Sequence, residues 1–161
     1  MNEAFSYLQT NVKGVSQLEQ RLRDLGLQTG RKCLEIFTFR QRLFKRQTAA
    51  ATSQNARIEL LGWVSGEFWR WLFGKPADSL EKNTETEGEF MIWEDSPVYC
   101  TFNSVPKELG DFTTASFTAG IVQSVLTSYS FDCTVTAHCC PIQPDRMNRT
   151  LYLIRFKEAS N

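Results

Sequence analysis

The chain has 161 residues, of which 42% are hydrophobic and 22% charged, and its formal net charge is zero. This length is typical of one domain, and the composition supplies a core while excluding a highly charged disordered chain. A net charge of zero also excludes a general electrostatic footprint for nucleic acid. No apolar run is long enough to span a bilayer, and the first residues lack the pattern of a signal peptide. The five cysteines show no framework spacing, so we expect free thiols in a reducing compartment.

The charges are unevenly distributed along the chain. Residues 1–57 carry ten Lys or Arg against four Asp or Glu, whereas residues 58–112 carry four against eleven. A surface patterned in this way favours docking onto charged partners over catalysis.

The first third of the chain predicts helices. After a short helix at 5–12, Ser16 and Glu19 have the spacing of a capping box, and an apolar stripe at helical spacing continues to Phe37. Gly26 and Gly30 lie within this stripe. Either another backbone approaches the helix closely at these glycines, or the helix ends at Gly26 with a glycine cap.

The most apolar segment covers residues 58–73 and ends at Gly74. Ten of its sixteen residues are apolar, which is more than the single stripe of a surface helix. We therefore expect a helix that is either central in the core or covered by another chain. The basic and small residues of 39–55 before it predict a solvated connection.

The rest of the chain predicts strands in antiparallel pairs with one helix between them. Residues 78–89 are acidic and polar, and we expect at most one helical turn there, around 78–82. We expect strands at 90–93, 98–105, 131–139 and 151–157, and a helix at 114–129. This order indicates an α+β domain with helices packed on one face of the sheet.

No catalytic, metal or cofactor site emerges from the sequence. The one histidine, His138, alternates with Cys139 on a predicted strand, so their side chains point to opposite faces and do not form a nucleophile pair. No C-x-x-C pair or glycine-rich phosphate loop is present. The apolar helices instead exceed what four short strands can cover, which predicts a permanent partner chain. The alternative is a domain that binds a small molecule or acyl chain, with the aromatic residues of 58–73 lining a pocket.

Four segments resemble the small core subunits of the trafficking protein particle (TRAPP) vesicle-tethering complex, and within them the subunit 5 branch. The segments are residues 73–81, 104–108, 115–122 and 135–138. The run Ala-Ser-Phe-Thr-Ala-Gly-Ile-Val at 115–122 is the most specific of them. The resemblance extends from about residue 4 to residue 158, which is nearly the whole chain. It implies a single domain over residues 1–161, in which the loops at 39–55 and 140–150 are longer than expected for the family.

The resemblance implies an α/β-plait, a twisted four-stranded antiparallel sheet with helices on one side. It implies a non-catalytic scaffold without cofactors, which pairs with another small core subunit through its first two helices and contacts a longin-like subunit elsewhere. The whole complex would tether vesicles, promote nucleotide exchange on a Rab-type GTPase, and lie in the cytoplasm at the periphery of the cis-Golgi and endoplasmic reticulum.

Two sets of residues follow from this resemblance. The expected partner interface consists of Phe5, Leu8, Leu18, Leu22, Leu25, Gly26, Gly30 and Cys33. The family motif, expected to be mostly structural, consists of Ser116, Phe117, Ala119, Gly120 and His138. The related subunit that carries a fatty acyl chain has its cysteine at the start of the third helix, whereas this chain has no cysteine between Cys33 and Cys100.

Overall fold

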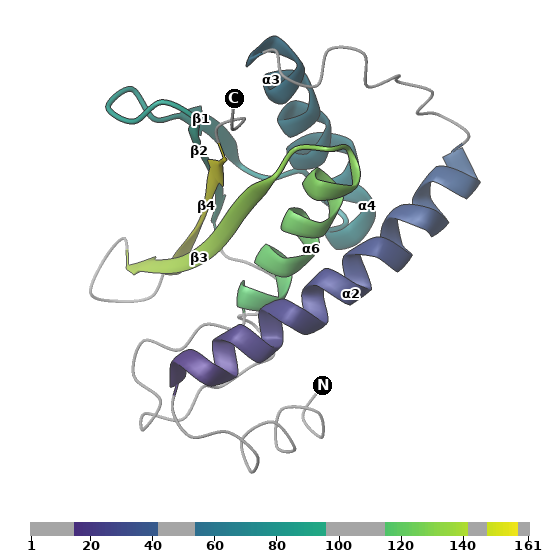
Figure 1. Cartoon of the computed structure of the whole chain (residues 1–161), viewed down its shortest axis with the longest axis horizontal. Helices are drawn as coiled ribbons and strands as arrows, with labels where there is room; N and C mark the ends of the chain where they lie inside the picture. The colour runs from purple at the N-terminus through teal and green to yellow at the C-terminus, as the bar shows by residue number, and fades with distance from the viewer. Residues whose placement is uncertain (1–14, 42–53, 96–114, 142–147, 158–161) are drawn as a thin grey trace.

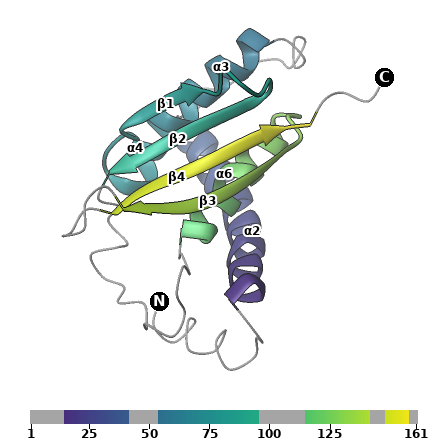
Figure 2. The same cartoon turned by 90° about the vertical axis from the view of Figure 1, so that its left-hand side faces the viewer.

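The computed structural model describes residues 15–41, 54–95, 115–141 and 148–157. In these ranges the chain forms a four-stranded antiparallel sheet in the order β1-β2-β4-β3, with helices on one of its faces (Figures 1 and 2). The predicted α+β class and the α/β-plait are therefore confirmed. α6 lies between the sheet and the long helix α2, so the molecule is layered as sheet, α6 and α2 in this region (Figure 1).

The elements have the following bounds. The helices are α2 (Val15–Gln41), α3 (Gln54–Trp63), the π-helical turn η1 (Val64–Phe68), α4 (Trp69–Phe73) and α6 (Ala115–Ser128). The strands are β1 (Ser79–Lys82), β2 (Glu89–Asp95), β3 (Cys133–Pro141) and β4 (Asn148–Phe156).

The sheet has a buried face and an open face because side chains alternate along each strand. On β2, Phe90 and Ile92 are buried beneath the helices, at 2% and 0% exposed. Met91 and Trp93 point to the opposite face and are half-buried. No helix of the described ranges covers that opposite face, which we call the open face (Figure 2).

The segments α3, η1 and α4 form one helix through the core. Within the π turn, hydrogen bonds reach five residues back, and the Trp69 N–H donates to the Val64 carbonyl. Because this turn is wider than an α-helical turn, Val64 and Trp69, which are five residues apart, lie towards the same side of the helix. Both side chains are fully buried. Of the two interpretations of the apolar segment 58–73, the central position in the core is therefore correct. Its end at Gly74 is also confirmed, since Gly74 adopts a left-handed φ of 82° and donates its N–H to the Arg70 carbonyl at 2.8 Å.

Several predicted boundaries need correction. Residues 79–82 form the edge strand β1, not a helical turn, because their backbone pairs with β2. The connection predicted at 39–55 is shorter at both ends, since α2 continues to Gln41 and α3 begins at Gln54; no glycine or proline stops α2 earlier. Similarly, β3 extends to Pro141 and β4 begins at Asn148. The helix expected at 5–12 and the strand expected at 98–105 lie outside the described residues.

Candidate interaction surfaces

Glycines allow α2 and α6 to cross with their backbones in contact. A Cβ atom on Gly30 would lie 2.8 Å from the carbonyl oxygen of Ile121. A Cβ on Gly26 would overlap the carbonyl oxygen of Phe117, and one on Gly120 would overlap that of Arg23. These three glycines therefore permit an approach that any larger residue would prevent.

This crossing changes the interpretation of two predicted interface residues. The close approach of another backbone at Gly26 and Gly30 is confirmed, and α2 continues past both glycines, so the helix does not end at Gly26. However, the backbone that approaches them belongs to α6 of the same chain. Their assignment to a partner interface is therefore corrected, because α6 occupies the space beside them.

The remaining predicted interface residues have different environments. Leu18 and Leu22 are buried, at 3% and 9% exposed, and Cys33 is half-buried against the core. Leu25 is 43% exposed. Phe5 and Leu8 lie outside the described residues.

With the exposed polar residues Gln28 and Lys32 between them, α2 exposes two large apolar side chains, Leu25 and Ile36, the latter 48% exposed. The two residues are eleven apart, close to three helical turns, so they share one side of the helix. That side differs from the side of Gly26 and Gly30, which faces α6. We call the exposed residues Leu25, Gln28, Lys32 and Ile36 the α2 flank.

The motif residues have mainly structural positions. Ser116, Ala119 and Gly120 are buried in α6, and Phe117 is half-buried against the core. His138 is exposed on the open face, where its Nε2 lies 3.0 Å from the Thr136 hydroxyl. The histidine is therefore a sheet-surface residue, as its position in the sequence indicates.

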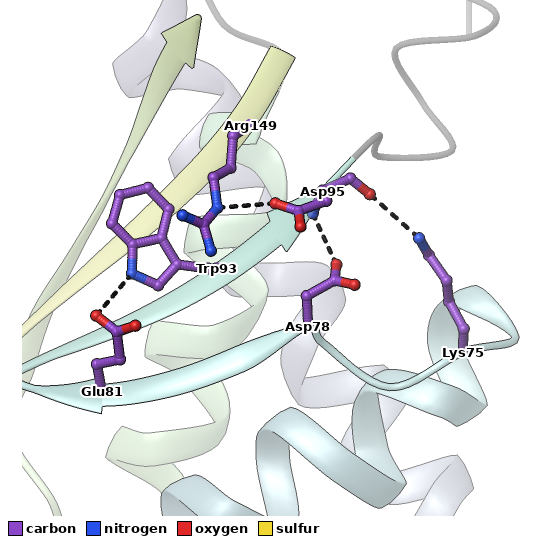
Figure 3. Close-up of polar contacts among 6 residues, drawn as sticks. All are labelled: Lys75, Asp78, Glu81, Trp93, Asp95 and Arg149. Carbon is purple, nitrogen blue, oxygen red and sulfur yellow. Dashed lines mark hydrogen bonds and ion pairs between the residues drawn. The ribbon is translucent and has the colours of Figure 1, made fainter. Parts of the chain in front are cut away.

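A network of polar contacts orients Trp93 on the open face (Figure 3). Its indole Nε1 donates to Glu81 at 3.3 Å, and the Arg149 guanidinium carbon lies 4.2 Å from the ring centroid. Arg149 also forms an ion pair of 2.7 Å with Asp95.

Two further contacts anchor Asp95 itself, at the end of β2 (Figure 3). Its backbone N–H donates to the Asp78 carboxylate at 2.7 Å, and Lys75 Nζ donates to its carbonyl at 3.2 Å. The Trp93 ring is thus held in place before any partner binds.

The opposite end of β2 carries a second charge pair on the same face. Arg155 Nε donates to Glu89 at 2.5 Å, and the Asn83 amide donates to the other carboxylate oxygen at 2.6 Å. The hydrogen bonds from Asn83 and Arg155 hold the pKa of Glu89 below its usual value. Glu89 is therefore a structural carboxylate in its charged form.

A third carboxylate of β2, Glu94, lies on the buried face and is 0% exposed. Tyr152 donates its hydroxyl to it at 3.3 Å, and burial raises the pKa of Glu94 above its usual value. The indole of Trp69 and the charge of Lys75 act in the opposite direction. The net shift is upward, so burial outweighs these interactions and disfavours the charged form of Glu94.

The two thiols whose side chains the structure describes, Cys33 and Cys133, also lack the features of reactive groups. Burial raises the pKa of Cys133 to about 12 and that of Cys33 above its usual value, whereas a nucleophilic cysteine needs a lowered pKa. Among the described residues, no group of three or more His, Cys, Asp or Glu side chains is arranged to hold a metal ion.

Sequence reasoning missed the open face as a surface. The signal for it is present, because residues 90–93 are apolar at both alternations. Arg149 and Arg155 are an even number of residues apart and so share one face of their strand. What the sequence lacked was the pairing of β2 with β4, which places these residues side by side.

Comparison with known proteins gives the class of protein. The family model described as Transport protein particle (TRAPP) component matches residues 1–157. The chain is 37% identical over 155 residues to trafficking protein particle complex subunit 5 of Dictyostelium discoideum, covering 96% of this chain and 80% of that protein. It is also 37% identical to the human subunit 5, covering 98% of this chain and 77% of that protein. The chain therefore belongs to the TRAPP component family, and its relatives include proteins of the subunit 5 branch.

A solved structure supports the fold independently. It is a trafficking protein particle complex subunit 3 from Naegleria fowleri covalently bound to palmitic acid, with a TM-score of 0.77. The superposition covers 98% of this chain and 90% of that one at 14% sequence identity, so this likeness concerns the fold alone. In the part of the chain that the structure describes, no helix combines the length and the apolar character needed to cross a membrane.

Proposed function

We propose that this chain is a non-catalytic scaffold subunit of a TRAPP complex and pairs with another small TRAPP subunit through the α2 flank. The observation that carries this proposal is the exposure of Leu25 and Ile36 on one side of a helix whose other side packs on α6. Large apolar side chains exposed on one helix side are typical of a surface that another chain covers. The family to which the chain belongs supports a TRAPP subunit as that chain.

We further propose that the chain acts within vesicle traffic between the endoplasmic reticulum and the Golgi. Its contribution is to the assembly of a complex that promotes nucleotide exchange on a Rab-type GTPase. The support for this is the chain's membership of the TRAPP component family.

The acyl-binding alternative is disfavoured by the packing of the aromatic residues. The ring of Phe37 lies 5.5 Å from Trp63, 5.7 Å from Phe68 and 5.4 Å from Trp71, each in an edge-to-face arrangement. Such contacts are typical of a filled core, in which the rings pack on one another and not on a ligand.

A matched pair of variants tests the proposed pairing. We expect Leu25→Asp combined with Ile36→Asp to abolish co-purification with a co-expressed small TRAPP subunit of the same organism, because two charges would be buried at the contact. Ile58→Asp is the control, since Ile58 is 43% exposed but lies on α3. Thermal unfolding checks that each variant is folded.

The proposal is contradicted if the Leu25 and Ile36 double variant, folded by this criterion, co-purifies with the partner as efficiently as the wild-type chain. It is also contradicted if Ile58→Asp alone abolishes the pairing while the double variant retains it.

A further inference from the structure

The open face of the sheet carries an apolar stripe along its two central strands. The register pairs Trp93 of β2 with Leu151 of β4, and Met91 with Leu153, and all four side chains are half-buried. We call these four residues the open-face stripe. Since neighbouring strands lie about 4.8 Å apart, two strands with their side chains make a strip about one helix wide.

Polar residues border this stripe on both edge strands. β1 places Ser79 and Glu81 on the open face, and β3 places Thr134, Thr136 and His138 there. A second sheet packed on this face would need apolar residues across all four strands. The narrow stripe fits a single helix better than a sheet.

The two ends of the stripe each carry an arginine of β4. Arg149 and Arg155 are six residues apart, which corresponds to about 20 Å along a strand. In the described part of the chain both form their ion pairs through Nε, to Asp95 and to Glu89. The terminal nitrogens of each guanidinium therefore remain available for a partner carboxylate, and the Arg155 side chain is 64% exposed.

We propose that the open-face stripe binds an amphipathic helix of another polypeptide that carries an acidic side chain at each end of its apolar side. The apolar centre is complementary to the apolar side of the helix, and the two arginines are complementary to its acidic ends. A helix spans about 20 Å in about 13 residues, so the two acidic residues stand about four turns apart. Trp93, already fixed by Glu81 and Arg149, forms the anchor of the contact.

This surface differs from the α2 flank, because α6 lies between the sheet and α2 (Figure 1). The proposal therefore does not depend on pairing through α2, and the chain can bind one partner on each side. A chain with two such surfaces connects its neighbours in an assembly.

Two synthetic helical peptides test the proposal against the full-length chain. Both carry the same leucine side; one has glutamates about fourteen residues apart at its ends, and the other has lysines at those positions. In an NMR titration we expect the glutamate peptide to shift the Trp93 indole and the Leu151 and Leu153 amide signals. We also expect it to bind at least tenfold more tightly than the lysine peptide.

Charge reversal provides the decisive comparison. We expect Arg149→Glu combined with Arg155→Glu to reverse the preference towards the lysine peptide. Arg155→Glu alone, at the more exposed site, is expected to reduce the preference. Because this substitution places a like charge beside Glu89, thermal unfolding checks that the variant is folded. Arg70→Glu combined with Lys82→Glu is the control, because both residues are exposed outside the open-face stripe and the charge change is the same.

Three results would overturn the proposal. The first is equal affinity for the two peptides, or binding of neither. The second is an unchanged preference in folded Arg149 and Arg155 variants. The third is a concentration-dependent dimer that Trp93→Ala abolishes, which would assign the open face to a second copy of the chain.

Discussion

Glu89 and Glu94 stand five residues apart on one strand and occupy opposite faces of the sheet. The first accepts hydrogen bonds from Asn83 and Arg155 at the open face, and the second is buried beside Tyr152. Their pKa values consequently shift in opposite directions, lowered for Glu89 and raised for Glu94. Alternation along one strand thus places one of these two identical side chains among hydrogen-bond donors and the other in the core.

These opposite shifts predict opposite dependences of stability on pH. As the pH rises above 4.5, the usual value for Glu94, the unfolded chain loses this proton while the folded chain retains it, so the contribution of Glu94 to the free energy of unfolding falls. We therefore expect Glu94→Gln to gain stability relative to the wild type as the pH rises from 4.5. Urea unfolding at several pH values measures this difference.

Glu89→Gln serves as the internal comparison for the same measurement. Because the pKa of Glu89 is lowered, its stabilising contribution is present above 4.5 and is lost as the pH falls through the folded-state pKa. Glu89→Gln should therefore be least stable relative to the wild type at neutral pH, with the difference closing in acid. Identical pH profiles for the two variants would contradict the assigned environments.

Sequence patterns predict the face of the strand on which a side chain lies where this depends only on neighbouring residues in the sequence. The alternation of the strand expected at 131–139 is observed, because Cys133 and Val135 are buried whereas His138 is exposed. The burial of Glu94 was not predictable in this way, because it depends on Tyr152, which is 58 residues away in sequence.

At the scale of elements, the crossing of α2 and α6 depends most directly on the sequence. Gly26 and Gly30 cost helix stability in isolation, and the structure accounts for them through the contact with α6. Sequence reasoning correctly predicted a close backbone approach, but it could not tell whether the approaching helix belonged to the same chain.

A pair of glycine substitutions tests this crossing. We expect Gly26→Ala to lower the free energy of unfolding by about 1–3 kcal/mol, because its Cβ would overlap the carbonyl oxygen of Phe117. Gly62→Ala is the matched control on α3, where an added Cβ meets nothing within 4 Å. That substitution should be neutral or stabilising by about 0.5–1 kcal/mol, since alanine favours helix. Equal effects in denaturant unfolding would contradict the crossing.

Other elements were predicted to different degrees. The helix at 114–129 and the strands at 131–139 and 151–157 are confirmed, with shifts of up to three residues at their ends. β1 was missed because its polar sequence, Ser-Leu-Glu-Lys, has no strand pattern, and only its pairing with β2 makes it a strand. The π-helical turn η1 has no sequence signal, because it depends on how Val64 and Trp69 fit the core.

At the scale of the whole molecule, the fold leaves less apolar surface exposed than the sequence predicts. The apolar helix at 54–73 is absorbed by the core, where Leu61, Phe68 and Trp69 are fully buried. Apolar side chains outside the core occur on the α2 flank, on the open-face stripe and at Ile58 of α3. The helix α2 and the sheet lie on either side of α6 (Figure 1). This arrangement agrees with the two interaction surfaces proposed for the chain.

Hydrogen–deuterium exchange of the full-length chain, alone and bound to a small TRAPP subunit, tests the role of the α2 flank most directly. Covering the flank should restrict local opening of α2, so we expect amide exchange across residues 20–37 to slow in the complex. Peptides from α3, which carries the exposed Ile58, should exchange at an unchanged rate. A complex that forms while exchange across residues 20–37 stays the same would contradict pairing through the α2 flank.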